Sequence, residues 1–169
     1  PDNIDLHEMA MIGCQLIKPA ADQKNITLYN RVSEDAIAYA DYQMVDTIIR
    51  NLLSNAVKFT PQDGEVVIES ENINDHLMIK VRDSGVGMSD DIKSKLFRID
   101  KSITTPGTNN ESGTGLGLIL CKELIEKNHG TISVESEKGK GTTFKFTLLK
   151  SDNQFERENE NNNLEYKRD

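Results

Sequence analysis

The chain has 169 residues, 36 % of them hydrophobic and 28 % charged, which is an ordinary composition for one globular domain. Its net charge of -8 argues against a broad nucleic-acid-binding surface, because such a surface needs a basic face. No apolar run is long enough to cross a membrane, so we expect no direct membrane contact by this domain.

Apolar residues recur with helical spacing in three segments. The first predicted helix covers residues 5–18 and has an apolar side formed by Leu6, Met9, Ile12, Leu16 and Ile17. A second helix is capped by Asp41 and ends near Phe59, before Thr60 and Pro61. A short helix begins at Ser89, and a third long helix covers residues 115–127.

Strand-like segments lie between these helices, and their predicted ranges are 26–30, 36–40, 66–70, 77–82, 131–137 and 142–149. Helices and antiparallel hairpins alternate without a βαβ rhythm, so the predicted class is α+β with helices on one face of a sheet. Asn and Glu dominate after residue 149. We therefore expect one domain over residues 1–149 and a disordered tail over residues 150–169.

The second helix carries polar residues on a face separate from its apolar stripe. Asn51, Asn55 and Lys58 are spaced i, i+4 and i+7 and share that face. An amide oxygen is a suitable ligand for Mg²⁺, and a lysine can meet a phosphate as a point charge. A solvated polar face explains the same pattern about equally well.

An aspartate at the end of a predicted strand opens a second pattern, Asp83-Ser84-Gly85-Val86-Gly87-Met88. The glycines let the backbone bend and approach a ligand. A carboxylate there can accept a hydrogen bond from the exocyclic amine of adenine, whereas guanine carries a carbonyl at that position. An ordinary Asp-Gly turn is the alternative.

Two further segments have a pattern typical of nucleotide sites. Gly113-Thr114-Gly115-Leu116-Gly117-Leu118 enters a helix, and free amides at a helix N-terminus bind phosphate. The segment has neither Walker nor Rossmann spacing, and a flexible helix entry is the alternative. At the start of the last strand, Thr142 or Thr143 could place a hydroxyl near a bound base, although strand propensity explains both threonines equally well.

These motifs together resemble a known family. Residues 51–60 resemble the N box of sensor histidine kinases, and residues 83–88 resemble their G1 box. Leu96-Phe97 is similar to the start of the F box, and residues 113–118 are similar to the G2 box. The motifs occur in the family's order, and the likeness covers about residues 3–149.

The resemblance implies the Bergerat ATP-binding fold, a two-layer α/β sandwich with a mixed, mostly antiparallel sheet. It implies ATP and Mg²⁺ as cofactors, with Asn55 holding the metal and Asn51 and Lys58 beside it. Asn55 and Lys58 are the expected catalytic residues. The residues expected to meet the phosphates are Gly113, Thr114, Gly115, Leu116 and Gly117.

For the base, the resemblance implies that Asp83 reads adenine and that Gly85 and Gly87 shape the wall of its site, with Thr142 as a further candidate. Residues 99–112 would form the ATP lid. One departure concerns the F box: many members carry a second aromatic residue three positions after the first Phe, whereas this chain has Asp100 there.

The implied function is transfer of the γ-phosphoryl group of ATP to a histidine on a separate dimerisation and phosphoacceptor domain, which serves a response regulator. His7-Glu8 begins like an acceptor motif, but no proline follows four residues after Glu8, so His7 is interpreted as an exposed helix residue. A non-catalytic ATP-sensing module and an ATP-hydrolysing module are the alternatives. Hydrolysis would require a glutamate base just before Asn51, where Arg50 stands.

We expect a cytoplasmic domain. Because the chain begins with Pro1 rather than Met, we also expect it to be a piece of a longer protein. This expectation allows for a membrane anchor elsewhere in the longer protein.

Overall fold

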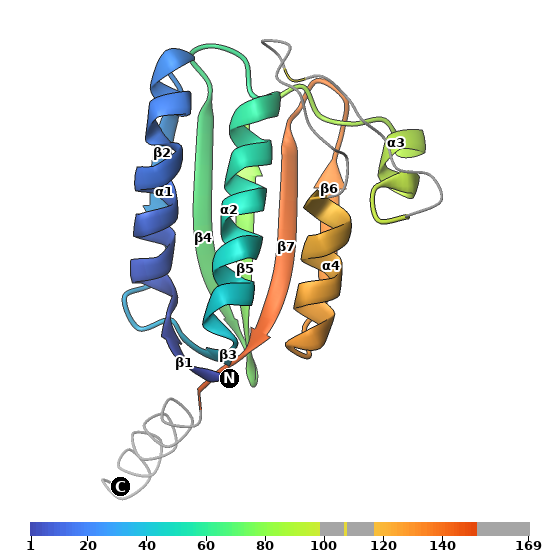
Figure 1. Ribbon diagram of the computed structural model, residues 1–169. Helices are drawn as coiled ribbons and strands as arrows, with labels where there is room; N and C mark the ends of the chain where they lie inside the picture. The colour runs from blue at the N-terminus through green and yellow to red at the C-terminus, as the bar shows by residue number, and fades with distance from the viewer. Residues whose placement is uncertain (99–106, 108–116, 152–169) are drawn as a thin grey trace, which may run out of the picture.

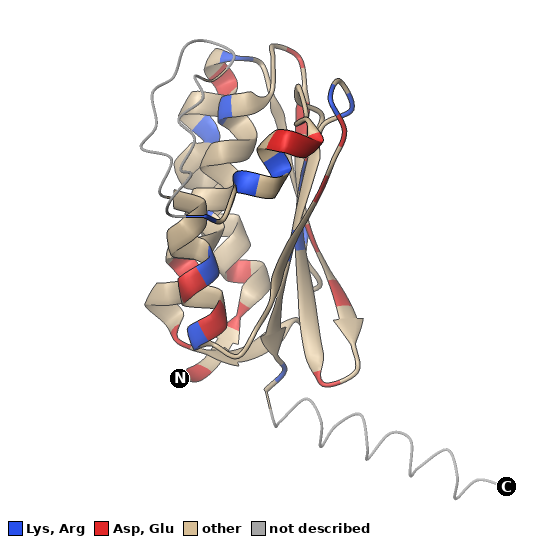
Figure 2. Ribbon diagram, turned by 90° about the vertical axis from the view of Figure 1, so that its right-hand side faces the viewer, with Lys and Arg blue, Asp and Glu red and all other residues tan. Residues whose placement is uncertain are grey.

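The computed structural model describes residues 1–98, 107 and 117–151. Long helices cover one face of a five-stranded sheet, and the opposite face carries no helix of the described residues (Figures 1 and 2). The helices are α1 (Leu6–Gln23), α2 (Tyr42–Phe59), α3 (Asp90–Lys95) and α4 (Gly117–Lys127). No helix of this described part is long and apolar enough to span a membrane.

The strands of the main sheet are, in spatial order, β2 (Thr27–Arg31), β4 (Glu65–Ile73), β5 (His76–Asp83), β7 (Thr142–Leu149) and β6 (Ile132–Ser136). Strands β2 and β4 are parallel, and every other neighbouring pair is antiparallel. The predicted α+β class and its mixed, mostly antiparallel sheet are therefore confirmed.

Alternation along β5 shows how the sheet divides its two faces. Leu77, Ile79 and Val81 are buried in the core with apolar residues of the helices. Lys80 and Arg82 alternate with these residues along the strand and therefore point to the other face, which we call the open face. This alternation places Asp83 on the helix side of the sheet, where it is the last residue of the strand.

Helix α2 is the central element of the helical layer. Its N-cap, Asp41, accepts a hydrogen bond from the amide of Met44 as predicted. The predicted apolar stripe is buried along its whole length, at Val45, Ile48, Ile49, Leu52, Leu53 and Ala56. Burying this stripe leaves the polar face of α2 at the edge of the core.

Helix α1 differs from the prediction in length and in its buried face. The helix continues through Pro19 to Gln23, supported by an ion pair of 3.0 Å between Lys18 and Asp22 one turn apart. Leu16 is 55 % exposed, so its assignment to the apolar side was wrong. Gly13 takes part in the contact instead, because a Cβ there would lie only 3.0 Å from Leu53 Cδ1 of α2. The two helices meet where α1 has no side chain.

A second, two-stranded sheet formed by β1 (Asp2–Asp5) and β3 (Ile37–Ala40) lies at the end of the molecule where the chain begins, and β1 was not predicted. Lys150 pairs with Ala38 of this sheet, and the amide of Ser151 donates to the carbonyl of Ile37. Both residues are buried. The folded part of the chain therefore includes Lys150 and Ser151, which lie beyond the expected boundary at residue 149. The rest of the expected tail lies outside the described residues.

Candidate functional site

The candidate residues of α2, β5, β7 and α4 converge at one end of the sheet. Helix α2 and strand β5 both finish there, whereas β7 and α4 begin there, at the upper end in Figure 1. The described residues contain no cluster of three or more His, Cys, Asp or Glu that could hold a metal by themselves.

The two asparagines of α2 have different surroundings. The side-chain amide of Asn51 donates to the carbonyl of Thr47 at 3.0 Å, and its Oδ1 would lie 3.1 Å from a Cβ added to Gly117. Asn51 therefore touches the first turn of α4. Asn55 is half-buried, and its side chain has no hydrogen-bond partner within the described ranges. Its amide oxygen can accept a ligand without breaking a contact of the fold.

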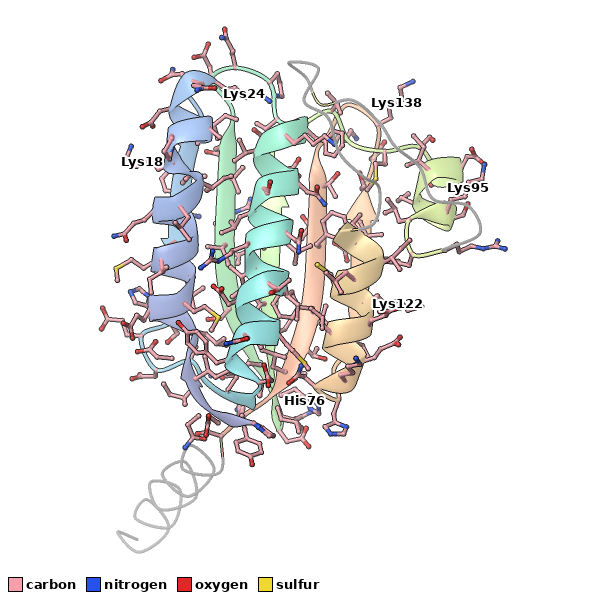
Figure 3. The ribbon with its side chains drawn as sticks, viewed as in Figure 1. Lys18, Lys24, His76, Lys95, Lys122 and Lys138 are labelled. Carbon is pink, nitrogen blue, oxygen red and sulfur yellow. The ribbon has the colours of Figure 1, made fainter. Side chains whose placement is uncertain are left out.

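The last turn of α2, which carries Lys58, is capped by the side chain of Lys24. Lys24 was not identified from the sequence. Lys24, which is 2 % exposed, donates from Nζ to the carbonyls of Val57 and Lys58 at 2.9 and 3.1 Å (Figure 3). A cation at this position complements the negative end of the helix dipole. The Lys58 ammonium lies 5.0 Å from the centre of the Phe59 ring. Lys24 thereby fixes the backbone from which Lys58 projects.

Asp83 is the one carboxylate buried at this end among the described residues. It is 7 % exposed, and its Oδ1 accepts from the amides of Gly85 at 2.9 Å and Thr142 at 3.2 Å. Burial raises the pKa of Asp83 to about 6, and the two backbone hydrogen bonds oppose that increase. No hydrogen bond or ion pair to Oδ2 is formed by the described residues. The carboxylate therefore has one oxygen left for an external donor.

The glycines after Asp83 are needed for close packing inside the protein itself. A Cβ on Gly85 would lie 2.4 Å from the carbonyl oxygen of Phe59, at the end of α2. Gly87 has a φ of +67°, and a Cβ there would lie 2.0 Å from the carbonyl oxygen of Glu137. These contacts bring the loop after β5 against both α2 and the β6–β7 hairpin, and so shape the wall beside Asp83.

The two threonines at the start of β7 point to opposite faces. Thr142 pairs with Asp83 across the strands and lies on its side of the sheet, where it is 8 % exposed. Its hydroxyl lies 2.8 Å from the hydroxyl of Ser136. Thr143 pairs with Arg82 and faces the open side. Of the two threonines, Thr142 is the one that lies beside the carboxylate.

Several predicted residues lie outside the described part of the chain. These are Gly113, Thr114, Gly115 and Leu116, together with all of the expected lid except Gly107. Gly117 is described and begins α4. Leu96 and Phe97 of the F-box segment are partly buried against the core, whereas Asp100 is not described.

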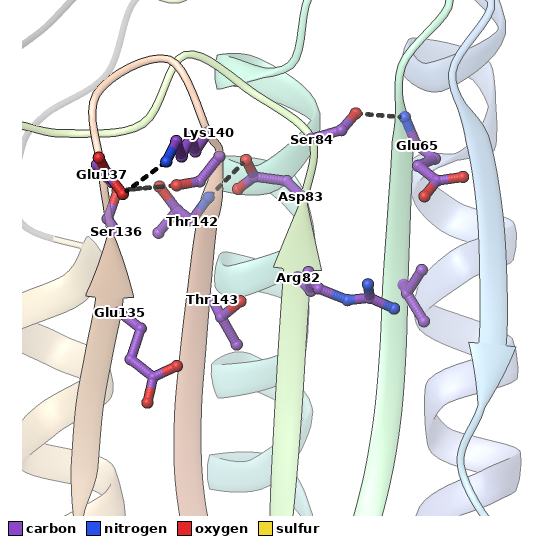
Figure 4. A pocket seen from close by; sticks show the side chains of 12 residues that line it. Glu65, Arg82, Asp83, Ser84, Glu135, Ser136, Glu137, Lys140, Thr142 and Thr143 are labelled. Carbon is purple, nitrogen blue, oxygen red and sulfur yellow. Dashed lines mark hydrogen bonds and ion pairs between the residues drawn. The ribbon is translucent and has the colours of Figure 1, made fainter.

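A cavity of about 490 Å³ lies on the open face rather than between helices and sheet (Figure 4). Its lining includes Arg82, Thr143 and Glu135 of adjacent strands. Of the predicted site residues, its lining includes Asp83, Thr142 and Thr143. The polar face of α2 contributes nothing to it, so this cavity is not where the candidate residues converge.

Two other interpretations can be checked against the side chains. Arg50 Nε lies 2.9 Å from Asp46 Oδ2 one turn earlier on α2, so Asp46 is engaged in an ion pair. His7 is half-buried rather than exposed, and its Nδ1 lies 2.7 Å from the carbonyl oxygen of Val32. That carbonyl can only accept, so Nδ1 carries the proton in this contact.

Comparison with known proteins identifies relatives of this arrangement. Residues 40–152 match the family model described as "Histidine kinase-, DNA gyrase B-, and HSP90-like ATPase". The circadian input-output histidine kinase CikA of Thermosynechococcus vestitus is 35 % identical over 134 residues, which cover 77 % of this chain and 18 % of CikA. The chain spans less than a fifth of the length of such curated relatives.

Solved structures agree with the sequence relatives. The catalytic domain of the histidine kinase ThkA superposes with a TM-score of 0.75 at 28 % identity, covering 88 % of this chain and 95 % of that domain. ThkA is also known in complex with the response regulator protein TrrA, where the match has a TM-score of 0.72 at 25 % identity and covers 89 % of this chain and 42 % of that one. Full-length ShkA in complex with AMPPNP matches with a TM-score of 0.76 at 27 % identity, over 89 % of this chain and 31 % of ShkA.

Proposed function

Since this chain belongs to the family of histidine kinase-, DNA gyrase B- and HSP90-like ATPases and is the ATP-binding catalytic domain of a sensor histidine kinase, we propose that it binds ATP with Mg²⁺ and donates the γ-phosphoryl group to a histidine on a separate phosphoacceptor domain. The site is the end of the sheet where α2, β5, β7 and α4 converge.

The observation that carries the proposal is the buried carboxylate of Asp83. Two backbone amides occupy Oδ1, whereas Oδ2 has no partner among the described residues. A buried carboxylate oxygen that lacks a donor is costly, and a ligand amine would relieve that cost. Adenine offers such an amine and guanine offers a carbonyl, so Asp83 selects adenine.

The residues on α2 fit a magnesium ion that is held mainly by the nucleotide. Asn55 offers a neutral amide oxygen without a competing hydrogen bond in the described structure. No acidic cluster that could bind a metal alone is present in the described ranges. Mg²⁺ commonly keeps waters and takes one or two protein ligands plus substrate phosphates, so Asn55 would hold it in that way. When bound, Mg²⁺ neutralises charge on the phosphates.

The phosphates would lie between α2 and the first turn of α4. Asn51 already contacts Gly117 there, and helix N-termini present free amides to anions. Lys58 would reach the phosphates as a point charge from the capped end of α2. Gly113, Thr114, Gly115 and Leu116 would add amides from the segment just before α4. Gly85, Gly87 and Thr142 would border the base.

The chain's own contribution to the chemistry is positioning and charge neutralisation. In the transfer, the bond between the γ-phosphorus and its bridging oxygen breaks, a phosphorus–nitrogen bond to the acceptor imidazole forms, and ADP leaves. The imidazole brings its own nucleophilicity, so no general base from this chain is required. Asp46, the nearest acid before Asn51 on α2, is already paired with Arg50. This favours transfer to an imidazole over activation of water.

The partners follow from the same proposal. The immediate partner is the dimerisation and phosphoacceptor domain of the parent kinase, and the response regulator is reached through it. The complex of ThkA with TrrA supports this assignment by analogy. We also propose a cytoplasmic location and one domain that includes Lys150 and Ser151.

The test is radiolabelled ATP with Mg²⁺, supplied first to this chain alone and then to this chain with the parent kinase's phosphoacceptor domain in excess. We expect no label on the chain alone, because His7 is hydrogen-bonded into the fold and has no acceptor motif around it. We expect acid-labile label on the added domain. The rate should rise with acceptor concentration, since separate domains lack the millimolar effective concentration of a tether.

Three outcomes decide between the alternatives. Label on this chain alone would overturn the assignment of the acceptor to another domain. Release of inorganic phosphate without label on either protein would favour an ATP-hydrolysing module. Measured ATP binding with neither label nor phosphate release would favour an ATP-sensing module.

A further inference from the structure

Ser136 is half-buried and is the last residue of β6. Its hydroxyl accepts from the amide of Met88 at 2.8 Å, lies 2.8 Å from the Thr142 hydroxyl and lies 3.0 Å from the carbonyl oxygen of Gly141. Its own carbonyl accepts from Lys93 Nζ at 2.7 Å. Figure 4 shows Ser136 beside Thr142, with Asp83 on the next strand.

These contacts join three segments that are distant in sequence. Met88 belongs to the loop after β5, Lys93 belongs to α3, and Thr142 begins β7. A further backbone hydrogen bond of 2.6 Å, from the amide of Gly139 to the carbonyl of Val86, holds the same loop against the same hairpin. Ser136 is the residue at which the loop, the short helix and the hairpin meet.

The direction in which the Ser136 hydroxyl donates its one hydrogen bond determines whether the Thr142 hydroxyl can donate to a ligand or accept from it. A serine hydroxyl donates one hydrogen bond and accepts up to two, and the Met88 amide takes one acceptor position. If Ser136 donates to Gly141, Thr142 can donate to Ser136 and keeps its lone pairs for a ligand. If Ser136 donates to Thr142, the Thr142 proton is available to a ligand. The direction in which Ser136 donates therefore sets whether Thr142 offers a ligand its lone pairs or its proton.

Thr142 is fixed beside the carboxylate on which the proposed base recognition depends, because its backbone amide donates to Asp83 Oδ1. Its side chain is on the same face of the sheet. A change at Ser136 therefore reaches Asp83 through a single residue.

We propose that Ser136 is a positioning residue for the adenine base: it orients the Thr142 hydroxyl beside Asp83 and anchors α3 and the loop after β5 around it. This inference rests on the proposed function, because it assumes that ATP binds at Asp83. It adds a residue that lies outside the motifs identified in the sequence.

The experiment compares Ser136→Ala with Ser133→Ala, a matched control on the same strand whose side chain is exposed on the open face. Titration calorimetry with ATP and Mg²⁺ should show three- to tenfold weaker binding by Ser136→Ala, and no change in Ser133→Ala. This range corresponds to the loss of about one neutral hydrogen bond. Ser136→Thr keeps the hydroxyl and should recover most of the affinity.

A double-mutant cycle with Thr142→Val separates positioning from a general loss of structure. If Ser136 acts through Thr142, Ser136→Ala should weaken ATP binding no further once Thr142→Val is present. Additive losses would overturn the proposal. Hydrogen exchange without nucleotide gives the structural readout, and Ser136→Ala should deprotect the Met88 amide.

The failure of this inference differs from failure of the proposed function. If the wild-type protein binds ATP and Ser136→Ala binds it equally well, Ser136 is not a positioning residue, even if the Met88 amide is deprotected. If the wild-type protein binds no ATP, the proposed function fails, and this inference is overturned with it.

Discussion

The two faces of the main sheet differ in whether their charged side chains are paired. On the open face, Lys80 lies 2.7 Å from Glu71, and Lys145 is paired with Glu135 across β6 and β7. On the helix face, the same strand that carries Lys80 ends in Asp83, which no lysine or arginine of the described residues neutralises. Alternate residues of one strand thus lie in contrasting electrostatic surroundings.

The carboxyl pKa values follow this contrast. Hydrogen bonding to lysine lowers the pKa of Glu71 and of Glu135, and both carboxylates are open to solvent. Burial raises the pKa of Asp83 to about 6. Exposed ion pairs contribute little to stability, whereas a buried carboxylate with a spare oxygen opposes folding unless something binds it. The comparison shows that the open face carries paired, solvent-exposed charges, whereas the helix face carries a buried carboxylate with one oxygen left without a partner among the described residues.

The largest expected effect is a difference in the free energy of unfolding between replacing a buried lysine and replacing an exposed one. Lys24→Met should lower the free energy of unfolding by about 1–3 kcal/mol, because the carbonyls of Val57 and Lys58 lose a buried donor. Lys80→Met on the open face should lower it by about 0–1 kcal/mol. Urea denaturation of both variants measures the difference. Equal decreases in the free energy of unfolding in the two variants would contradict the contrast between the buried and the exposed lysine.

A smaller effect is expected on the pH dependence of ATP binding. The ionised form of Asp83 is the acceptor for the adenine amine, and its pKa is about 6. ATP affinity should therefore fall about tenfold between pH 7.5 and pH 5 beyond the change seen in Asp83→Asn. The variant removes the contribution of the nucleotide's own titration from the comparison. A parallel decline in both proteins would show that Asp83 does not contact the base.

The raised pKa of Asp83 also predicts the direction in which the free energy of unfolding changes with pH in the absence of nucleotide. The folded protein holds the Asp83 proton more tightly than the unfolded chain, whose carboxyl has the ordinary value of 3.8. The free energy of unfolding should therefore decrease relative to Asp83→Asn as pH rises from about 4 through 6. Above that range the difference should be constant.

The smallest expected effect is that of Asn55→Ala on stability. The side chain has no hydrogen bond in the described structure, and alanine is the better helix former. Thermal unfolding without nucleotide should change by no more than about 0.5 kcal/mol, whereas Mg²⁺-dependent ATP binding should weaken. A decrease in melting temperature by many degrees would instead assign Asn55 to the structure.

Local periodicity predicted the parts of the site that lie on single elements. Helical spacing separated Asn51 and Asn55 from the apolar stripe of α2, and the strand pattern put Asp83 at the end of its strand. Lys24 and Ser136 carried no such signal. The Val57 carbonyl that Lys24 contacts lies 33 residues away, and the Met88 amide that donates to Ser136 lies 48 residues away. Their roles arise from the packing of distant segments.

The errors in the fold have similar causes. The apolar pattern of α1 included Leu16, because spacing alone does not reveal that the helix contact is made at Gly13. The strand β1 covers only four residues, and its partner lies more than thirty residues away, so no local pattern marks it. Lys150 and Ser151 were assigned to the tail because of its polar composition, although long-range hydrogen bonds attach both residues to the fold.

The most direct test of the account is the nucleotide preference of the wild-type protein. Titration calorimetry with Mg²⁺ should give ATP binding at least tenfold tighter than GTP binding, because guanine would present a carbonyl to the buried Asp83 carboxylate. Asp83→Asn should reduce that preference, while Glu135→Gln on the open face should leave it intact. Equal affinities for ATP and GTP in the wild-type protein would contradict the assignment of Asp83 as the residue that reads the base.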